Sequence, residues 1–306
     1  SYNPNVQNLP RRPGVRECFI PRDGYAYVFV DYSAAELVGF AQILLNRYGQ
    51  SRLADTINAG RDTHLFTASS MVGCTYEHIL AAYNAGDKAA SDERQLSKIA
   101  NFGFAGGLGG AAFLEYARQQ TRKPDGTFPD YILALTEERC TEIRNIWQDT
   151  YDEVRWYFKD AGRETKNGPA TIVQIGSNRV RGGLTFTNWC NTWFQGLVAD
   201  GAKLALYRVA RACWYDIGSA LYGCRPVNFP HDEVIVEAPI ERVHEAAEAM
   251  STLMIDAMRQ FITGVTVKVE AASALRWYKG AKPVHDTAGR LVPGKPEGKR
   301  WVAACG

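Results

Sequence analysis

The alternation of apolar and polar residues first predicts a strand, a polar turn and a helix. Residues 25–30 are aromatic, β-branched or small and apolar, and they follow residues 21–24, which carry Pro, Asp and Gly. A run of this kind behind a turn is typical of a buried strand. After Asp31, Tyr32 and Ser33, apolar residues recur at spacings of three and four through residues 37–45. That spacing indicates one face of a helix.

The rest of the pattern predicts a helical insertion between two strand-containing parts. Helical spacing predominates over residues 57–165, where glycines between 103 and 110 end one helix and begin another. After it we expect, in order, a strand at 170–175, a helix at 187–214, two short strands around His231 and Asp232, a helix at 242–261 and a strand at 265–269. Residues 280–306 hold five Gly, three Pro and five basic residues, which predicts a mobile basic tail.

The composition excludes several classes of protein. Of the 306 residues, 46% are hydrophobic and 22% are charged, which excludes a disordered, collagen-like or coiled-coil chain. No apolar run reaches the roughly 18 residues of a spanning helix, so we expect a soluble protein that does not enter a membrane. The 35 basic and 33 acidic residues leave a net charge of +2. This balance does not by itself indicate a nucleic-acid partner.

Cysteine usage and the first residues bear on the compartment. The seven cysteines include no C-x-x-C pair, so we predict neither a disulfide framework nor a zinc site, and a reducing compartment fits best. The chain opens at Ser1 without a basic and apolar leader, so nothing indicates secretion. We expect it to be a piece of a longer protein.

Two distant aspartates are the first candidates for chemistry. Asp31 ends the predicted strand, and Asp232 lies in the later hairpin beside His231 and Glu233. Magnesium takes a few carboxylates and leaves room for phosphate oxygens, so aspartates from two strands can share a metal site. Taken singly, an aspartate after a strand is more often a helix cap, and one at a hairpin is more often a turn former. The adjacent acids of the hairpin repel each other unless a cation neutralises them.

A second candidate is a stripe of three side chains on one predicted helix. Arg94, Lys98 and Phe102 are spaced four apart, so they lie along one face and span about 12 Å. Two cations followed by an aromatic ring suit a triphosphate with a stacked base or sugar. The alternative is a solvated charged stripe that ends in a core phenylalanine.

In this order, the motifs resemble those of family A DNA polymerases. Motif A of that family, D-Y-S-x-x-E-L, is matched by residues 31–37, motif B, R-x-x-x-K-x-x-N-F-G, by residues 94–103, and motif C, H-D-E, by residues 231–233. Flanking segments also resemble the family: residues 3–10 (N-P-N-V-Q-N-L-P), 62–64 (D-T-H), and 191–200, with N-T-x-x-Q-G-x-x-A-D. The resemblance runs from residue 1 to about 279.

The resemblance implies a metal site and a chemical step. Asp31 and Asp232 would hold two Mg²⁺ ions with the backbone carbonyl of Tyr32, supported by Glu233. One ion would lower the pKa of the primer 3′ hydroxyl and the other would neutralise charge on the triphosphate and the leaving pyrophosphate.

The resemblance also implies how the substrates are bound. Arg94, Lys98 and His64 would bind the triphosphate, Phe102 would stack on the incoming nucleotide, and Lys98 would also donate charge or a proton to the leaving group. Tyr32 would line the same nucleotide site. Contacts with template or primer would come from Arg12, Asn191, Gln195 and His231.

Sugar selection is the third property that the resemblance implies. Glu36 matches the glutamate that the family places beneath the sugar ring to exclude a 2′ hydroxyl, the group that distinguishes RNA from DNA. An exposed helical glutamate is the alternative. Two positions depart from the family: Gly106 stands where a tyrosine is usual, and Val38 where an arginine is common. The T-G-R segment, the thumb and any exonuclease domain are expected on an upstream region that this chain lacks.

The predicted fold is therefore α+β, a polymerase palm with an inserted helical fingers subdomain. The palm would be an antiparallel sheet with helices on one side, from residues 1–56 and 171–280, with the fingers at 57–170 and the tail at 281–306. We expect a template-directed DNA polymerase of the cytoplasm of a bacterium or a phage-infected host, acting on primer-template DNA and deoxynucleoside triphosphates. The alternatives are a catalytically silent nucleic-acid-binding scaffold and an RNA polymerase or primase-like enzyme.

Overall fold

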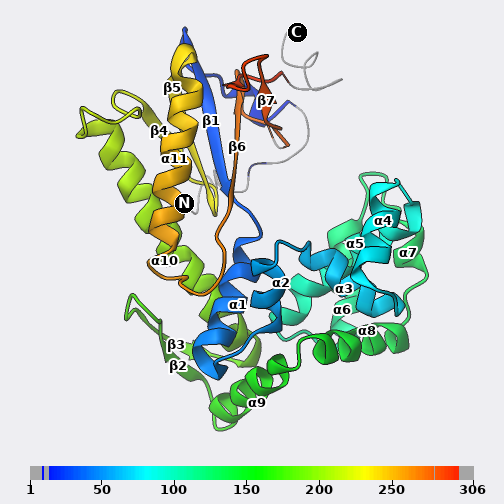
Figure 1. The fold of residues 1–306 in the computed structure, drawn as a ribbon. Coiled ribbons are helices and arrows are strands. Elements are labelled where there is room, and N and C mark those ends of the chain that lie inside the picture. Colours follow the sequence, from blue (N-terminus) through cyan, green and yellow to red (C-terminus); the bar gives the residue numbers. More distant parts are fainter. Residues whose placement is uncertain (1–8, 10–13, 279, 296–306) are drawn as a thin grey trace. The chain divides into compact units, whose positions relative to one another are not determined.

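The predicted strand at residues 25–30 lies at the centre of a four-stranded antiparallel sheet. The computed structural model describes Leu9, residues 14–278 and residues 280–295. The strand order is β4-β5-β1-β6 (Figure 1). The bounds are β1 (Tyr25–Tyr32), β4 (Arg225–Asn228), β5 (Glu233–Pro239) and β6 (Val269–Ala274). Strands β4 and β5 are the hairpin predicted around His231 and Asp232.

The chain divides into two compact units, which we describe separately. Unit 1 contains the described residues up to 35, residues 198–261 and the described residues from 267 onward; unit 2 contains residues 36–197 and 262–266. The predicted fingers, residues 57–170, fall entirely in unit 2. The palm and fingers boundaries themselves stay a prediction.

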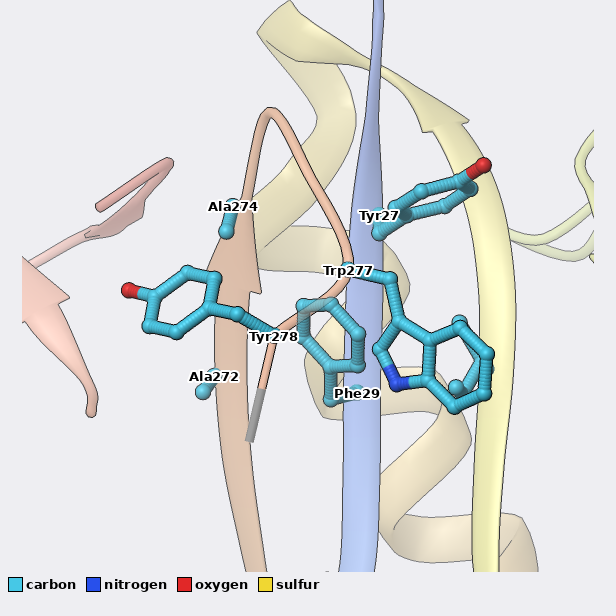
Figure 2. Packing of buried hydrophobic residues seen from close by; sticks show 7 residues of the cluster. Tyr27, Phe29, Ala272, Ala274, Trp277 and Tyr278 are labelled. Atoms are coloured by element: carbon cyan, nitrogen blue, oxygen red, sulfur yellow. The ribbon is translucent and has the colours of Figure 1, made fainter. Parts of the chain in front are cut away.

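Both faces of the unit 1 sheet are covered by apolar side chains. On one face, Tyr27 and Phe29 pack with Trp277 and Tyr278 of the segment after β6 (Figure 2). On the other, helix α11 (Val243–Met258) lies along β1 and β6. There the Tyr32 hydroxyl donates a hydrogen bond of 2.6 Å to the Met254 carbonyl. Burial on both faces explains why the β1 sequence is almost continuously apolar.

The last predicted strand is shifted along the chain. We expected residues 265–269, but β6 is Val269–Ala274. The Asn58 side chain accepts from the Thr266 amide at 2.8 Å and donates to the Gly264 carbonyl at 2.9 Å. These bonds hold residues 264–266 in unit 2, outside the sheet.

The described part of the predicted tail is ordered into a hairpin, which corrects the expectation of a mobile segment. Strands β7 (Val284–His285) and β8 (Leu291–Val292) pair across a turn. Asp286 Oδ1 accepts from the amides of Ala288 and Arg290, both at 2.9 Å. Leu291 is buried. Local turn chemistry therefore outweighs the Gly and Pro content here.

Unit 2 is mainly helical. Its elements are α1 (Ala35–Tyr48), which begins one residue before the unit, α2 (Arg52–Asn58), α3 (Thr63–Val72), α4 (Tyr76–Asn84), α5 (Lys88–Ala105), α6 (Gly110–Thr121), α7 (Asp130–Leu133), α8 (Glu137–Thr150), α9 (Glu153–Thr165), the hairpin β2 (Ala170–Val173) and β3 (Val180–Leu184), and the start of α10 (Phe186–Trp214). Helix α10 continues into unit 1. Side-chain caps begin several of these helices, among them Asp62 on α3 and Asp87 on α5.

Aromatic rings fill the interior of unit 2. Phe104 packs against Phe113 at 4.4 Å and against Trp147 at 5.7 Å between ring centroids. Together with Tyr151, these rings join α5, α6 and α8. The C-terminal half of α5, which carries motif B, is therefore fixed on its inner side by packing. No helix in the described part of the chain has the length and apolar character needed to cross a membrane.

Candidate active site

The predicted site residues fall into two groups, one in each unit. In unit 1, Asp31 of β1 lies directly opposite Glu233 of β5, and Asp232 immediately precedes that strand. Opposed residues of an antiparallel pair share one face, so the Asp31 and Glu233 side chains project from the same side of the sheet. Asp31 also lies opposite Glu270 of β6. Three acidic side chains thus form a row across β5, β1 and β6.

The hairpin turn carries motif C in a specific backbone geometry. The Glu233 amide donates to the Pro230 carbonyl at 3.1 Å, which closes the turn. His231 has φ 61°, a left-handed conformation that non-glycine residues adopt uncommonly. His231 is exposed, whereas Asp232 and Glu233 are half-buried. The turn therefore fixes the backbone from which both acids project.

Tyr32 anchors the end of β1. Its hydroxyl bonds to Met254 on the helix-covered side. Burial raises the Tyr32 pKa; the charge of Arg208 opposes this effect and that of Asp232 adds to it. Because successive residues of a strand point to opposite faces, anchoring Tyr32 against α11 directs Asp31 away from that helix.

The donor set at this end of the sheet suits magnesium. Among the described residues, no group of three or more His, Cys, Asp or Glu side chains is placed so that together they could hold a metal ion. Mg²⁺ is usually held by one or two carboxylates and by substrate phosphates, not by an all-protein cage. Asp31, at the end of β1, and Asp232, in the turn directly before the neighbouring strand β5, are the candidates for that pair of hard oxygen donors.

In unit 2, the motif B arginine is held by an aspartate of the neighbouring helix. Arg94 Nε and Nη2 donate to Asp62 Oδ2 at 2.9 and 2.7 Å. Asp62 Oδ1 meanwhile caps α3 by accepting from the amides of His64 and Leu65. Burial would raise the Asp62 pKa, but the Leu65 amide and the Arg94 guanidinium outweigh it and lower that pKa. Arg94 is thereby fixed in position with its charge partly balanced.

A buried hydrogen-bond network sets the protonation of His64. Trp147 Nε1, which can only donate, bonds to Asn101 Oδ1 at 2.9 Å. The Asn101 amide nitrogen therefore lies 3.0 Å from His64 Nδ1 and donates to it. The ring proton must then reside on Nε2.

His64 is also held neutral. Its side chain is 8% exposed. Burial lowers its pKa to about 4; Asp62 opposes the shift, and the charges of Arg94 and Lys98 add to it. At neutral pH, His64 is thus an uncharged group with a single Nε2 donor, suited to hydrogen-bond a phosphate oxygen.

The other two members of the helical stripe lie where the sequence placed them. Lys98 is exposed and Phe102 is half-buried on α5. The rings of Phe102 and His64 lie 5.9 Å apart. The structure thus brings Arg94, His64 and Phe102 together along α3 and α5, with the Lys98 ammonium on the same helix.

Glu36 lies in the first turn of α1 and accepts a hydrogen bond from a residue of α10. Gln195 Nε2 donates to Glu36 Oε1 at 3.2 Å. Asn191, one turn earlier, donates its Nδ2 to the Thr187 carbonyl at 2.9 Å. Gln195, expected to touch nucleic acid, therefore also contacts the expected sugar-selecting residue. Arg12 lies outside the described residues.

The structure adds three residues that the sequence reasoning missed. Asp62 was noted only within a flanking motif, and Asn101 only as a motif letter, yet they position Arg94 and His64. Glu270 joins Asp31 through strand register, which residue spacing alone does not reveal. The Asp62 signal was available, because an Asp before a helix predicts a cap.

The comparisons with known proteins agree with these features. The family described as DNA polymerase family A matches residues 1–279. DNA polymerase I of Aquifex aeolicus is 28% identical over 281 residues, covering 91% of this chain and 43% of the relative. DNA polymerase I of Bacillus subtilis is 26% identical over 298 residues, covering 91% of this chain and 29% of the relative. The chain thus spans less than half the length of these relatives.

A solved structure shares the fold. The POL domain of Pol1 from M. smegmatis, in complex with DNA primer-template and dNTP, aligns with a TM-score of 0.67 at 23% identity, covering 90% of this chain and 45% of that one. The predicted α+β architecture is confirmed by this likeness and by the antiparallel sheet. With motifs A, B and C all inside the matched residues, the chain belongs to DNA polymerase family A.

Proposed function

We propose that this chain catalyses template-directed addition of deoxynucleotides to a primer 3′ end. The observation that carries the proposal is the register of β1 and β5, which sets Asp31 of motif A opposite Glu233 of motif C, the residue directly after Asp232. Membership of the family supports the same reaction. In this proposal unit 1 is the palm, and unit 2 contains the fingers.

The palm acids would hold the metal ions. Asp31 and Asp232 are the proposed Mg²⁺ ligands, with the Tyr32 carbonyl as a further donor and Glu233 in support. When bound, the ions would activate the primer hydroxyl and neutralise charge on the transferred phosphoryl group. The chain contributes the rigid placement of its carboxylates, fixed by the strand register and by the closed turn at Pro230.

The unit 2 cluster would bind the triphosphate. Arg94 keeps the Asp62 contact through Nε and Nη2, which leaves Nη1 for a phosphate oxygen. His64 adds a neutral Nε2 donor, and Lys98 adds a mobile positive charge next to the leaving group, where it would donate a proton. Phe102 would stack on the nucleotide. Such preorganised donors stabilise the charge that develops during phosphoryl transfer.

Selection of the sugar and grip on the nucleic acid complete the proposal. Glu36, held by Gln195, would lie beneath the sugar and exclude a 2′ hydroxyl. Asn191, Gln195, His231 and Arg12 would contact template or primer. A bacterial or phage-infected cytoplasm is the proposed setting.

The test is primer extension with Mg²⁺ and deoxynucleotides by the wild-type chain, Asp31→Asn and Asp232→Asn. We expect each substitution to lower the extension rate by about a thousandfold, since the charge stabilisation supplied through a metal is worth several kcal/mol. Primer-template affinity, measured by fluorescence anisotropy, should stay nearly unchanged. Asp23→Asn, an exposed acid just before β1 at its other end, is the matched control and should retain full activity.

Near wild-type extension by either variant would refute the metal assignment. A wild-type chain that binds primer-template but never extends it would instead indicate a silent scaffold. Equal extension with ribonucleotides, or synthesis without a primer, would favour an RNA polymerase or primase-like enzyme.

A further inference from the structure

The second half of α10 has a buried side and an exposed side. Gly201 marks the buried side, because a Cβ at this position would collide with Met258 of α11, the helix beside it (Figure 1). The opposite side carries exposed residues in the order cation, aromatic, cation, aromatic: Lys203, Tyr207, Arg211 and Trp214. Since each residue of a helix advances by about 100°, these side chains lie within about 80° of one another. They form a single stripe, which we call the α10 stripe.

The aromatic side chains of the α10 stripe are open to solvent. Tyr207 is 60% exposed and Trp214 is 55% exposed. Tyr215 and Ile217, directly beyond the stripe, are 80% and 79% exposed, so exposed apolar side chains cluster at this end of the helix. In the part of the chain that the structure describes, no other ring stacks on Tyr207 or Trp214. Clusters of this kind mark interaction sites, and the two rings are available for stacking.

The α10 stripe is also positively charged. Between Asp200 and Asp216 the sequence contains three basic residues and no acid. Neither Lys203 nor Arg211 forms an ion pair with another described residue, whereas a cation such as Arg139 contacts a carboxylate. Basic side chains that are not shared with carboxylates attract the phosphates of a nucleic acid.

The end of the stripe is remote from the proposed metal ligands. The Cys213 carbonyl accepts from the Gly223 amide at 3.0 Å, which ties the end of α10 to the segment before β4. Strand β4 begins opposite Glu237 of β5. Asp31 pairs instead with Glu233, four residues away on β5 and so at a distance of about 13 Å. A ligand at this end of α10 therefore occupies a site separate from the acids.

We propose that the α10 stripe binds single-stranded DNA, with bases stacked on Tyr207 and Trp214 and phosphates bound by Lys203 and Arg211. Alternating rings and cations suit a single strand, because its bases are free to stack on side chains and its backbone can follow the positive charges. In a duplex the bases already stack on one another, and an acidic peptide offers no bases to the rings. The inference rests on the proposed function in one respect: a template-directed DNA polymerase meets single-stranded DNA as the uncopied template.

The experiment measures the binding of a fluorescent oligo(dT) of about 16 nucleotides by anisotropy, in EDTA and without nucleotides, so that catalysis plays no part. Tyr207→Ala and Trp214→Ala should each weaken binding roughly tenfold, the effect of losing one stacked base. Tyr207→Phe keeps the ring and should retain most of the affinity. The double variant Lys203→Gln with Arg211→Gln should make the slope of log affinity against log salt shallower by about 1.4, or about 0.7 for each phosphate of a single strand.

Trp156→Ala and Lys159→Gln, at exposed positions of α9, are the matched controls and should leave oligo(dT) binding unchanged. Thermal melting identifies any variant that fails to fold, in which case the salt slope of the double variant carries the test. The inference is overturned by a wild type that does not bind oligo(dT), or by unchanged affinity in folded Tyr207→Ala and Trp214→Ala.

Three further probes test the choice of ligand: a DNA duplex, an oligo(rU) and polyglutamate. Tighter binding of any of them than of oligo(dT) would contradict the assignment to single-stranded DNA. Failure of the proposed function has a different signature, because a chain that binds oligo(dT) through the stripe but never extends a primer would support the inference and refute the proposed catalysis.

Discussion

At the scale of single residues, His64 shows how a hydrogen-bond network decides a chemical role. The resemblance to family A polymerases predicts that His64 binds the triphosphate, but it does not predict the charge of the imidazole. Trp147 fixes the orientation of Asn101, and Asn101 fixes the tautomer of His64. None of these contacts follows from spacing along the chain, because they join α3, α5 and α8.

The neutral state of His64 predicts an acid-sensitive component of stability. Its pKa falls from 6.5 to about 4 in the folded chain, chiefly through burial. Below pH 6.5 the unfolded chain takes up a proton on His64 that the folded chain does not bind. The free energy of unfolding is therefore highest above pH 6.5 and decreases as the pH falls toward 4. We expect His64→Gln, whose amide can replace both ring nitrogens, to lose less stability between pH 6.5 and 4 than the wild type.

Chemical denaturation at several pH values measures this difference. His78→Gln, at an exposed position of α4, is the control and should follow the wild-type curve. Identical pH curves for His64→Gln and wild type would show that His64 takes up its proton normally in the folded chain.

Arg94 is the second prediction at this scale. Its guanidinium contacts Asp62 through two nitrogens and leaves a third for phosphate. Lysine has one ammonium and cannot reproduce this fork. Arg94→Lys should therefore raise the KM for deoxynucleotides by about tenfold, the cost of one charged hydrogen bond. Steady-state extension measures KM, and Arg61→Lys, which alters an exposed pair with Glu77, should leave it unchanged.

At the scale of elements, strand register explains the row of acids on the palm sheet. Glu233, Asp31 and Glu270 lie opposite one another on three neighbouring strands. Like charges directly opposite in a sheet destabilise it, and we take the size of the effect to be that of a favourable cross-strand pair, about 0.2–1 kcal/mol. Glu270→Gln should therefore raise the free energy of unfolding by that amount in EDTA. Under the proposed metal assignment the gain should shrink in Mg²⁺, because bound ions would neutralise the same charges.

Denaturant unfolding with and without Mg²⁺ tests this prediction. Glu241→Gln removes an exposed acid that follows β5 and should give no gain in either condition. A Glu270→Gln variant that is less stable in EDTA would show that Glu270 makes a stabilising contact instead of repelling Asp31.

Elements with strong local signals were predicted well, and those set by distant contacts were not. Strand β1 is apolar except for Asp31, and it was identified close to its observed position. For α5 the sequence predicted only a helix that carries residues 94–102 and ends among the glycines from 103 onward, and the helix does end at Ala105. Strand β6 was misplaced because Val265 and Val267 look β-forming while Asn58 holds the adjacent backbone outside the sheet. The true strand, rich in Ala and Ser, has a weak propensity of its own and forms through pairing with β1.

At the scale of the whole molecule, basic and acidic residues are nearly equal in number, and several of the described cations are paired with acids. Among the residues that the structure describes, the cations that form ion pairs with acids of the same unit include Arg22, Arg47, Arg61, Lys88, Arg94, Arg139, Arg155, Arg163 and Arg290. With a net charge of +2 over the full sequence, a duplex would meet nearly as many acids as bases. Exposed ion pairs are weak, so a basic side chain can leave its acid to contact a DNA phosphate. Each pair that opens in this way leaves a carboxylate close to that phosphate.

This balance predicts weak, weakly salt-dependent binding of primer-template by the chain alone. Each phosphate neutralised by a basic side chain contributes about 0.9 to the slope of log affinity against log salt. The motif B cations are assigned to the triphosphate, and the cations named above are shared with carboxylates. We therefore expect a slope no steeper than about −3, equivalent to roughly three phosphate contacts, and dissociation after one or a few additions.

Anisotropy titrations over a range of salt concentrations measure the slope, and Arg94→Lys should leave it unchanged while weakening nucleotide use. The longer DNA polymerase I of Aquifex aeolicus, titrated in parallel, should give a steeper slope. Steep, processive binding by this chain would mean that its ion pairs open fully on the duplex and that their carboxylates are kept away from the phosphates.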